Sequence, residues 1–241
     1  MRLVRGDHAI FVSPVGGSIL GWEWRNQQIL GPTYQTQVNG VLKLRGETHW
    51  CFPNFGTDPT RMHKKHGWLR ETQLQLVSNS PSYAAFASDP KWERPVAIGI
   101  ELNVDENGIR SCLKIHNRSQ GRIPVLPALH PYFAVPEGGW NVVAGEVSLT
   151  SHVDNDDLAA GFPFGDFTKP VVVVLEGVGR ITVKTSLAET GMFVWSDRPS
   201  NYICVEEVFG KIGKFGDEHE GAWLNPGQHA AYNVEFGFRP E

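Results

Sequence analysis

The sequence predicts an antiparallel all-β fold that forms a single domain over residues 1–241. Apolar and polar residues alternate with a period of two in most of the short apolar runs, which is the pattern of half-buried strands. The chain contains 26 Gly and 16 Pro, and many of them lie between these runs, where they suit tight turns. No segment has a sustained helical stripe with capping residues. The apolar share of 41% is enough for a substantial core.

The first strands are expected at residues 9–12 and 19–24, on either side of a turn rich in Pro and Gly. Residues 67–77 alternate in the same way, with Trp68 and Leu74 on one face, and are therefore predicted to be a strand as well.

The clearest hairpin is predicted at residues 96–116. Its two strands carry apolar side chains on one face, namely Ile98, Ile100, Leu102, Val104, Ile109, Leu113 and Ile115. The turn between them ends in Asn107-Gly108, which supplies the positive φ that a tight hairpin needs.

The second half of the chain continues the pattern. A further hairpin is expected to pair residues 171–175 with 181–183 around a turn that contains Gly177 and Gly179. The remaining strands are expected at residues 192–195, 202–205 and 231–238.

A histidine lies in a rigid stretch in the middle of the chain, residues 127–133. Each proline of this stretch removes a backbone donor and fixes φ, so we expect a strand end here and not a mobile loop. The stretch holds His130 between two prolines and beside two aromatic residues. A histidine can give or take a proton near neutral pH, although one in such a position is more often structural than catalytic.

Positive charge is concentrated at residues 61–70, in a protein whose net charge is −4. The segment contains Arg61, His63, Lys64, Lys65, His66 and Arg70. Charge runs are usually solvated loops, but these residues would also suit the mouth of an anion-binding site. His63 and His66 have a spacing seen in metal ligands, yet no carboxylate or cysteine lies at ligand spacing, so we expect no metal.

Two adjacent glutamates, Glu206 and Glu207, lie late in the chain on a predicted strand. Alternation places Glu206 on the same face as Tyr202 and Cys204, and Glu207 on the opposite face. One of the two is therefore expected to point inward and the other toward water. A carboxylate drawn inward at a strand end is a candidate general base, whereas a surface glutamate is not.

The composition excludes several classes of function. A net charge of −4, without a Lys/Arg-rich stripe with interleaved aromatics, indicates no nucleic-acid partner. Cys51, Cys112 and Cys204 are far apart and lack CxxC spacing, which indicates neither a disulfide framework nor a zinc site. The N-terminus lacks an apolar signal core, and no run of about 18 apolar residues occurs. We expect a soluble, cytoplasmic protein with no membrane partner.

Several motifs together resemble those of the aldose 1-epimerase (galactose mutarotase-like) superfamily. They are His66-Gly67-Trp68-Leu69-Arg70, Leu129-His130-Pro131-Tyr132-Phe133, Cys204-Val205-Glu206 and Leu224-Asn225-Pro226-Gly227. A further segment, Arg45-Gly46 followed by Cys51-Phe52-Pro53-Asn54-Phe55-Gly56, is similar to one in the hexose-6-phosphate mutarotase branch. The resemblance spans residues 15–238 approximately, and its motifs follow in register.

This resemblance implies a large β-sandwich of two antiparallel sheets with a sugar site on the concave face. It also implies interconversion of the α and β anomers of an aldose, in which Glu206 takes the C1 hydroxyl proton and His130 protonates the ring oxygen. His66 would hydrogen-bond the sugar. The reaction involves no redox change, so no cofactor and no metal are expected. The expected partner is a small-molecule sugar or sugar phosphate, bound by a monomer or homodimer.

The resemblance also suggests residues that bind the rest of the substrate. Arg45 and Arg70 match arginines of the phosphosugar branch and would hold a 6-phosphate, aided by Lys64 or Lys65. Asp166 is the choice for an aspartate that binds sugar hydroxyls in the family. Its alternatives are Asp154, Asp156 and Asp157.

Some positions depart from the phosphosugar branch, and they leave the substrate open between a free hexose and a hexose 6-phosphate. Glu47-Thr48-His49 stands where the branch has Gly-Ile-Pro, and Glu207 stands where proline is usual. Extra carboxylates near a phosphate site oppose binding of an anion.

Two other functions are alternatives: a carbohydrate-binding β-sandwich without turnover, and a metal-dependent cupin-like isomerase. The latter would need a His-x-His cluster with a following glutamate, which this chain lacks.

Overall fold

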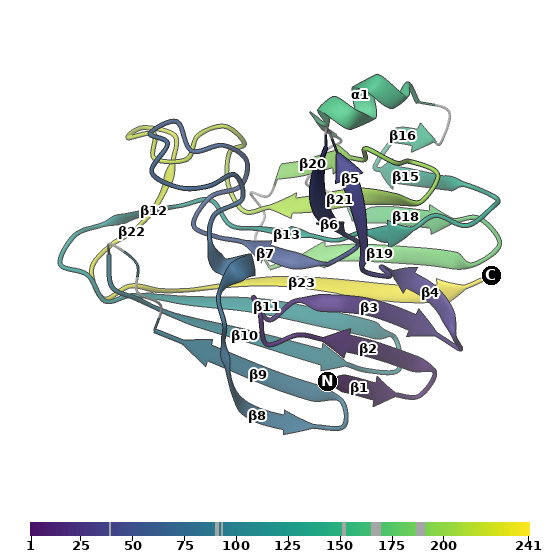
Figure 1. The fold of residues 1–241 in the computed structure, drawn as a ribbon, viewed down its shortest axis with the longest axis horizontal. Coiled ribbons are helices and arrows are strands. Elements are labelled where there is room, and N and C mark those ends of the chain that lie inside the picture. The colour runs from purple at the N-terminus through teal and green to yellow at the C-terminus, as the bar shows by residue number, and fades with distance from the viewer. Residues whose placement is uncertain (39, 90–91, 93, 151–152, 165–169, 187–190) are drawn as a thin grey trace.

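The computed structural model describes residues 1–241 except 39, 90–91, 93, 151–152, 165–169 and 187–190. Two large antiparallel sheets dominate the molecule, as predicted (Figure 1). Eight strands of the ten-stranded sheet follow one another in the order β1 (Arg2–Arg5), β2 (His8–Val12), β3 (Ile19–Trp24), β4 (Gln27–Leu30), β14 (Phe133–Ala134), β21 (Tyr202–Val208), β13 (Ala128–His130) and β7 (His49–Cys51). The other two are β20 (Gly191–Trp195), which pairs with β21, and β17 (Phe162–Pro163), which pairs with β20.

The nine-stranded sheet has the order β16 (Val147–Thr150), β15 (Trp140–Ala144), β18 (Val171–Leu175), β19 (Gly179–Thr185), β23 (His229–Pro240), β11 (Gly108–Asn117), β10 (Val96–Val104), β9 (Tyr83–Ser88) and β8 (Gln75–Ser80). Two smaller sheets join β12 (Ile123–Val125) to β22 (Ala222–Leu224) and β5 (Tyr34–Val38) to β6 (Val41–Arg45). The described helices are short: the 3₁₀-helix η1 (Leu69–Glu71) and the α-helix α1 (Asn155–Ala160).

The main core lies between the two large sheets. Trp22 of β3 and Phe133 of β14 contact Phe236 of β23, with ring centroids 6.5 and 5.7 Å apart, and all three side chains are buried. Aromatic side chains of this size contribute much of the apolar area that a sandwich core removes from water. Because this core covers only one face of the ten-stranded sheet, the opposite face is free to carry polar side chains.

Both predicted hairpins are confirmed. Strands β10 and β11 pair from Val96↔Asn117 to Val104↔Ile109, and the chain reverses at residues 105–108. Gly108 has a φ of +151°, and a Cβ there would lie 1.9 Å from the carbonyl oxygen of Phe236, so the position requires glycine. Strands β18 and β19 form the second hairpin.

The predicted strand at residues 67–77 is wrong over most of its length, because only the segment from Gln75 onward is a strand. His66 and Gly67 have positive φ values of 66° and 71°, which turn the chain before η1. The amides of Trp68 and Leu69 then donate to the carbonyl of Phe52 and not to a neighbouring strand. Apolar and polar residues therefore alternate in this segment although it does not belong to a continuous β-ladder.

Helix α1 was not predicted from the sequence. It has six residues, which is too short to show a helical stripe. Asp154 caps it, since the side chain accepts a hydrogen bond from the amide of Asp156. Leu158 is the buried residue of the helix.

Candidate functional site

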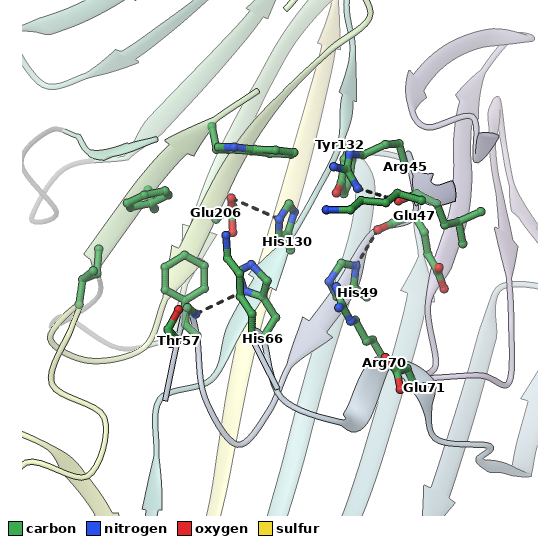
Figure 2. A pocket seen from close by; sticks show the side chains of 18 of the residues that line it. Arg45, Glu47, His49, Thr57, His66, Arg70, Glu71, His130, Tyr132 and Glu206 are labelled. Atoms are coloured by element: carbon green, nitrogen blue, oxygen red, sulfur yellow. Dashed lines mark hydrogen bonds and ion pairs between the residues drawn. The ribbon is translucent and has the colours of Figure 1, made fainter. Parts of the chain in front are cut away.

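A cavity of about 950 Å³ opens on the face of the ten-stranded sheet that points away from the main core (Figure 2). Alternation along β21 explains its position: Ile203 and Val205 belong to the core, whereas Glu206 lines the cavity. The same rule brings His49 of β7 and His130 of β13 to the cavity, since these strands flank each other in the sheet.

The walls of the cavity come from the hairpin β5–β6, from the segment before η1 and from β20. Aromatic rings line it at Phe55, Tyr132, Phe193 and Trp195. Polar side chains also line the cavity, and polar groups that converge between aromatic walls are typical of small-molecule sites.

The structure brings together His130 and Glu206, two residues 76 positions apart in the sequence. Their strands β13 and β21 pair directly, and Nε2 of His130 lies 3.4 Å from Oε1 of Glu206. The side chains are 6% and 2% exposed. The ring of Tyr132 stacks on that of His130 with centroids 4.9 Å apart, which restricts the orientation of the imidazole.

Burial determines the charge of this pair. It lowers the pKa of His130 well below the ordinary value, and it raises the pKa of Glu206 well above. Two neighbouring groups add to this effect or oppose it, since His49 lowers the pKa of His130 further and Lys65 lowers that of Glu206. The two groups therefore share one proton with no net charge, either as imidazole and carboxylic acid or as imidazolium and carboxylate.

His66, the second predicted histidine, lies beside this pair. Its ring packs edge-on against that of His130, with centroids 5.4 Å apart. The amide of Gly56 donates to Nδ1 of His66 over 3.4 Å, so the neutral ring carries its proton on Nε2. Burial, together with the neighbouring His49 and Lys65, lowers the pKa of His66 to about 2. This ring is therefore a neutral hydrogen-bond donor.

A third histidine, His49, belongs to the cavity and was not singled out as a site residue in the sequence. It lies opposite His130 in the β7–β13 ladder, and the two rings stack with centroids 5.0 Å apart and planes at 23°. The one sequence signal that pointed to this position was the replacement of the expected Gly-Ile-Pro by Glu47-Thr48-His49.

Three buried polar atoms of this cavity have no hydrogen-bond partner among the described residues: Nε2 of His49, Nδ1 of His130 and Oε2 of Glu206. Buried polar groups are normally paired, and an unpaired one costs about 1–3 kcal/mol. Three such atoms around one cavity indicate a ligand that carries several hydrogen-bonding groups.

The cationic residues of the site are not equivalent. Arg45 was predicted to bind a phosphate group. Its Nη2 lies 2.7 Å from Oδ2 of Asp197, so the positive charge of Arg45 is already compensated. Arg70 and Lys65 line the cavity, and within the described part of the chain neither has an ion-pair partner at the distances that define one. Lys64 instead pairs with Glu71 on the exposed surface.

The predicted sugar-binding aspartate, Asp166, lies outside the described residues. Of its alternatives, Asp154 caps helix α1, and Asp156 and Asp157 are exposed in its first turn. None of these three lines the cavity.

The expectation that one of the two adjacent glutamates faces water is wrong. Glu206 is 1% exposed and Glu207 is 4% exposed. Glu207 shares the core-facing side of β21 with Ile203 and Val205, and its Oε1 has no hydrogen-bond partner within the described ranges. Burial raises the pKa of Glu207 to about 8. The strand is covered on both faces, by the other sheet and by the walls of the cavity.

The described residues contain neither a cluster suited to a metal ion nor a helix suited to span a membrane. In this part of the chain no three His, Cys, Asp or Glu side chains are arranged to hold a metal ion. No helix within the same residues is both long and apolar enough to cross a membrane. Cys51, Cys112 and Cys204 are buried and free.

Comparison with solved structures identifies the fold. A galactose mutarotase-like protein from Lactobacillus casei superposes with a TM-score of 0.79 at 11% identity, covering 99% of both chains. A galactose mutarotase related enzyme from Lactobacillus acidophilus gives a TM-score of 0.78 at 13% identity, covering 99% of this chain and 97% of the other.

A galactose mutarotase-like protein from Clostridium acetobutylicum gives a TM-score of 0.69 at 12% identity, covering 100% of this chain and 95% of the other. No protein-family model and no curated protein matches the chain. The structural matches establish that the chain has the galactose mutarotase-like β-sandwich fold.

Proposed function

We propose that the chain is a mutarotase, an isomerase that interconverts the α and β anomers of an aldose. The observation that carries this proposal is the buried pair of His130 and Glu206, whose Nε2 and Oε1 atoms lie 3.4 Å apart inside a cavity with unpartnered polar atoms. An acid and a base at this spacing can act on two neighbouring oxygens of one ligand.

The two charge distributions of the pair correspond to the two sides of the reaction. In the ionic form, the Glu206 carboxylate takes the proton of the C1 hydroxyl while the imidazolium of His130 delivers a proton to the ring oxygen, and the bond between C1 and the ring oxygen breaks. The pair is then in its neutral form, and the sugar is an open-chain aldehyde. Rotation about the bond between C1 and C2, followed by the reverse transfers, closes the ring on the other face.

No step changes the net charge of the buried pair, which suits a site that disfavours isolated charge. His66 would donate its Nε2 proton to a sugar oxygen near the reacting carbon. The proposed substrate is a free hexose or a hexose 6-phosphate. Arg70, with Lys65, is better suited to hold a 6-phosphate than Arg45, because Asp197 already binds Arg45. Asp166 stays a prediction for a contact to sugar hydroxyls.

The test is NMR magnetisation exchange between the α and β anomers of glucose, galactose and glucose 6-phosphate. We expect acceleration of at least one sugar, and a loss of about 10²–10⁴-fold in His130→Ala and in Glu206→Gln, the usual contribution of acid–base catalysis. His116→Ala is the matched control, because His116 lies on β11 with its side chain on the outer face of the other sheet. Sugar binding without acceleration by the wild type would instead assign a carbohydrate-binding module.

The same assay tests the phosphate assignment. In Arg70→Met we expect a higher KM for glucose 6-phosphate and an unchanged KM for the neutral sugars. An equal rise in KM for the phosphorylated and the neutral sugars would show that Arg70 does not bind the phosphate.

A further inference from the structure

The protonation of His49 is fixed by its backbone surroundings. Nδ1 lies 2.8 Å from the carbonyl oxygen of Glu47, which can only accept a hydrogen bond, so Nδ1 carries the proton. The neutral ring then has its lone pair on Nε2. Burial, reinforced by the charge of Arg70, lowers the pKa of His49 to about 4, so the ring stays neutral at physiological pH.

Nε2 of His49 is therefore an acceptor without a donor. The residue is 5% exposed and lines the cavity, and in the described part of the chain Nε2 has no hydrogen-bond partner. Figure 2 shows the ring between Glu47 and Arg70, beside the ring of His130. A neutral acceptor can be satisfied only by a donor, so phosphate and carboxylate oxygens are unfavourable at this atom, whereas a hydroxyl group is suitable.

We propose that Nε2 of His49 accepts a hydrogen bond from a hydroxyl group of the bound sugar other than the anomeric hydroxyl. The anomeric hydroxyl and the ring oxygen are already assigned to Glu206 and His130, and this inference rests on that proposed function. His49 and His66 then complement each other, since one neutral ring accepts and the other donates. His49 is thus a specificity residue that requires a hydroxyl of the correct configuration.

The alternative role for His49 is purely to support the ring of His130 by stacking. Two substitutions separate the roles. His49→Phe keeps an aromatic ring against His130 but removes the acceptor. His49→Gln removes the ring but can place an amide oxygen near the position of Nε2.

The experiment measures binding of unreactive ligands, the 1,5-anhydro forms of glucose and galactose and their 6-phosphates, by titration calorimetry. These compounds lack the anomeric hydroxyl, so the measurement does not depend on turnover. We expect about tenfold weaker binding by His49→Phe, the usual loss for one such hydrogen bond, and binding by His49→Gln within about threefold of the wild type. Unchanged binding by His49→Phe, or equal losses in both variants, would overturn the proposal.

A second measurement uses the wild type alone and serves if His49→Phe does not fold. The ¹⁵N resonance of the unprotonated Nε2 of His49 is expected to move upfield when a saturating anhydro sugar donates a hydrogen bond to it. A sugar-bound protein whose resonance does not move would contradict the inference. If none of the four compounds binds to the wild type, the sugar site itself is wrong, and the hydroxyl assignment is overturned with it. If the wild type binds the sugars but does not accelerate anomer exchange, only the proposed catalytic function is contradicted, and the assignment of His49 still holds.

Discussion

Three histidine rings lie together in the cavity, and the backbone decides the chemical character of two of them. A carbonyl oxygen holds the proton of His49 on Nδ1, and a backbone amide at Nδ1 leaves the proton of His66 on Nε2. The third ring, that of His130, has a carboxyl group at its Nε2. An acceptor, a donor and a proton-transfer group thus arise from one residue type, because each ring has a different partner.

The shared proton of His130 and Glu206 predicts an unusual dependence on pH. A second proton would leave a buried cation, and loss of the shared proton would leave a buried anion, and burial disfavours both. We therefore expect the rate of anomer exchange to show no titration at 4.5 or at 6.5, the ordinary pKa values of glutamate and histidine. An activity that titrates near 6.5, the ordinary histidine value, would show that His130 ionises alone.

The variant Lys65→Met tests the electrostatic origin of this pH profile. Lys65 lowers the pKa of Glu206, so it favours the anionic state of the pair. Lys65 also lowers the pKa of His130, so its removal should move both the alkaline and the acid limit of activity to higher pH. A shift of the alkaline limit to lower pH would contradict this electrostatic account.

At the scale of elements, the segment between β7 and η1 positions His66. Its close approach to the end of β7 depends on Gly67, where a Cβ would lie 2.0 Å from the carbonyl oxygen of Phe52. That carbonyl also accepts the amide hydrogens of Trp68 and Leu69. Backbone hydrogen bonds thus fix the position of this segment, and the residue in the sequence that indicates this arrangement is Gly67.

We predict that Gly67→Ala lowers stability and displaces His66. The left-handed conformation alone costs about 1–2 kcal/mol for a residue with a Cβ. Gly56→Ala is the matched control, because Gly56 has the same φ of 71° but open space around its Cβ position. Urea unfolding should show a larger loss for Gly67→Ala than for Gly56→Ala. Equal losses would mean that the contact with Phe52 is relieved without cost.

At the scale of the whole molecule, the packing of the two sheets encloses a carboxyl group. Glu207 is buried on the core face of β21, where burial raises its pKa from 4.5 to about 8. The folded state therefore binds a proton that the unfolded chain releases between these two values. The stabilising effect of this proton is complete below pH 4.5, and it is lost as the pH rises toward 8.

Glu207→Gln is predicted to raise the free energy of unfolding above about pH 5, with a gain that grows toward pH 8. The pKa shift corresponds to about 3 kcal/mol at pH 7, as an order of magnitude. The measurement is urea unfolding of both proteins from pH 4 to pH 9, and the difference between them isolates Glu207 from the buried histidines. A difference that is independent of pH would show that Glu207 is ionised in the folded protein. Anomer exchange should persist in this variant, because Glu207 does not line the cavity.

The sequence alone was sufficient for the fold class and for both hairpins. The family resemblance pointed to His130, Glu206 and His66, and the structure places these three residues in one cavity. Period-two alternation and an Asn-Gly turn are local signals, so they can be recognised in the sequence without knowledge of the neighbouring strands. The same reasoning failed at residues 67–74, where residue types alternate but Gly67 turns the chain. It also missed helix α1, which is too short to produce a periodic signal.

Only the tertiary structure decided which strands lie side by side and which faces are covered. His49 joins the site because β7 pairs with β13, two strands that are far apart in the chain. Glu207 is buried because β21 is covered on both faces, whereas alternation can only assign Glu206 and Glu207 to opposite sides. The physical reason is that alternation follows from the geometry of one strand, while burial and pairing depend on contacts between distant parts of the chain.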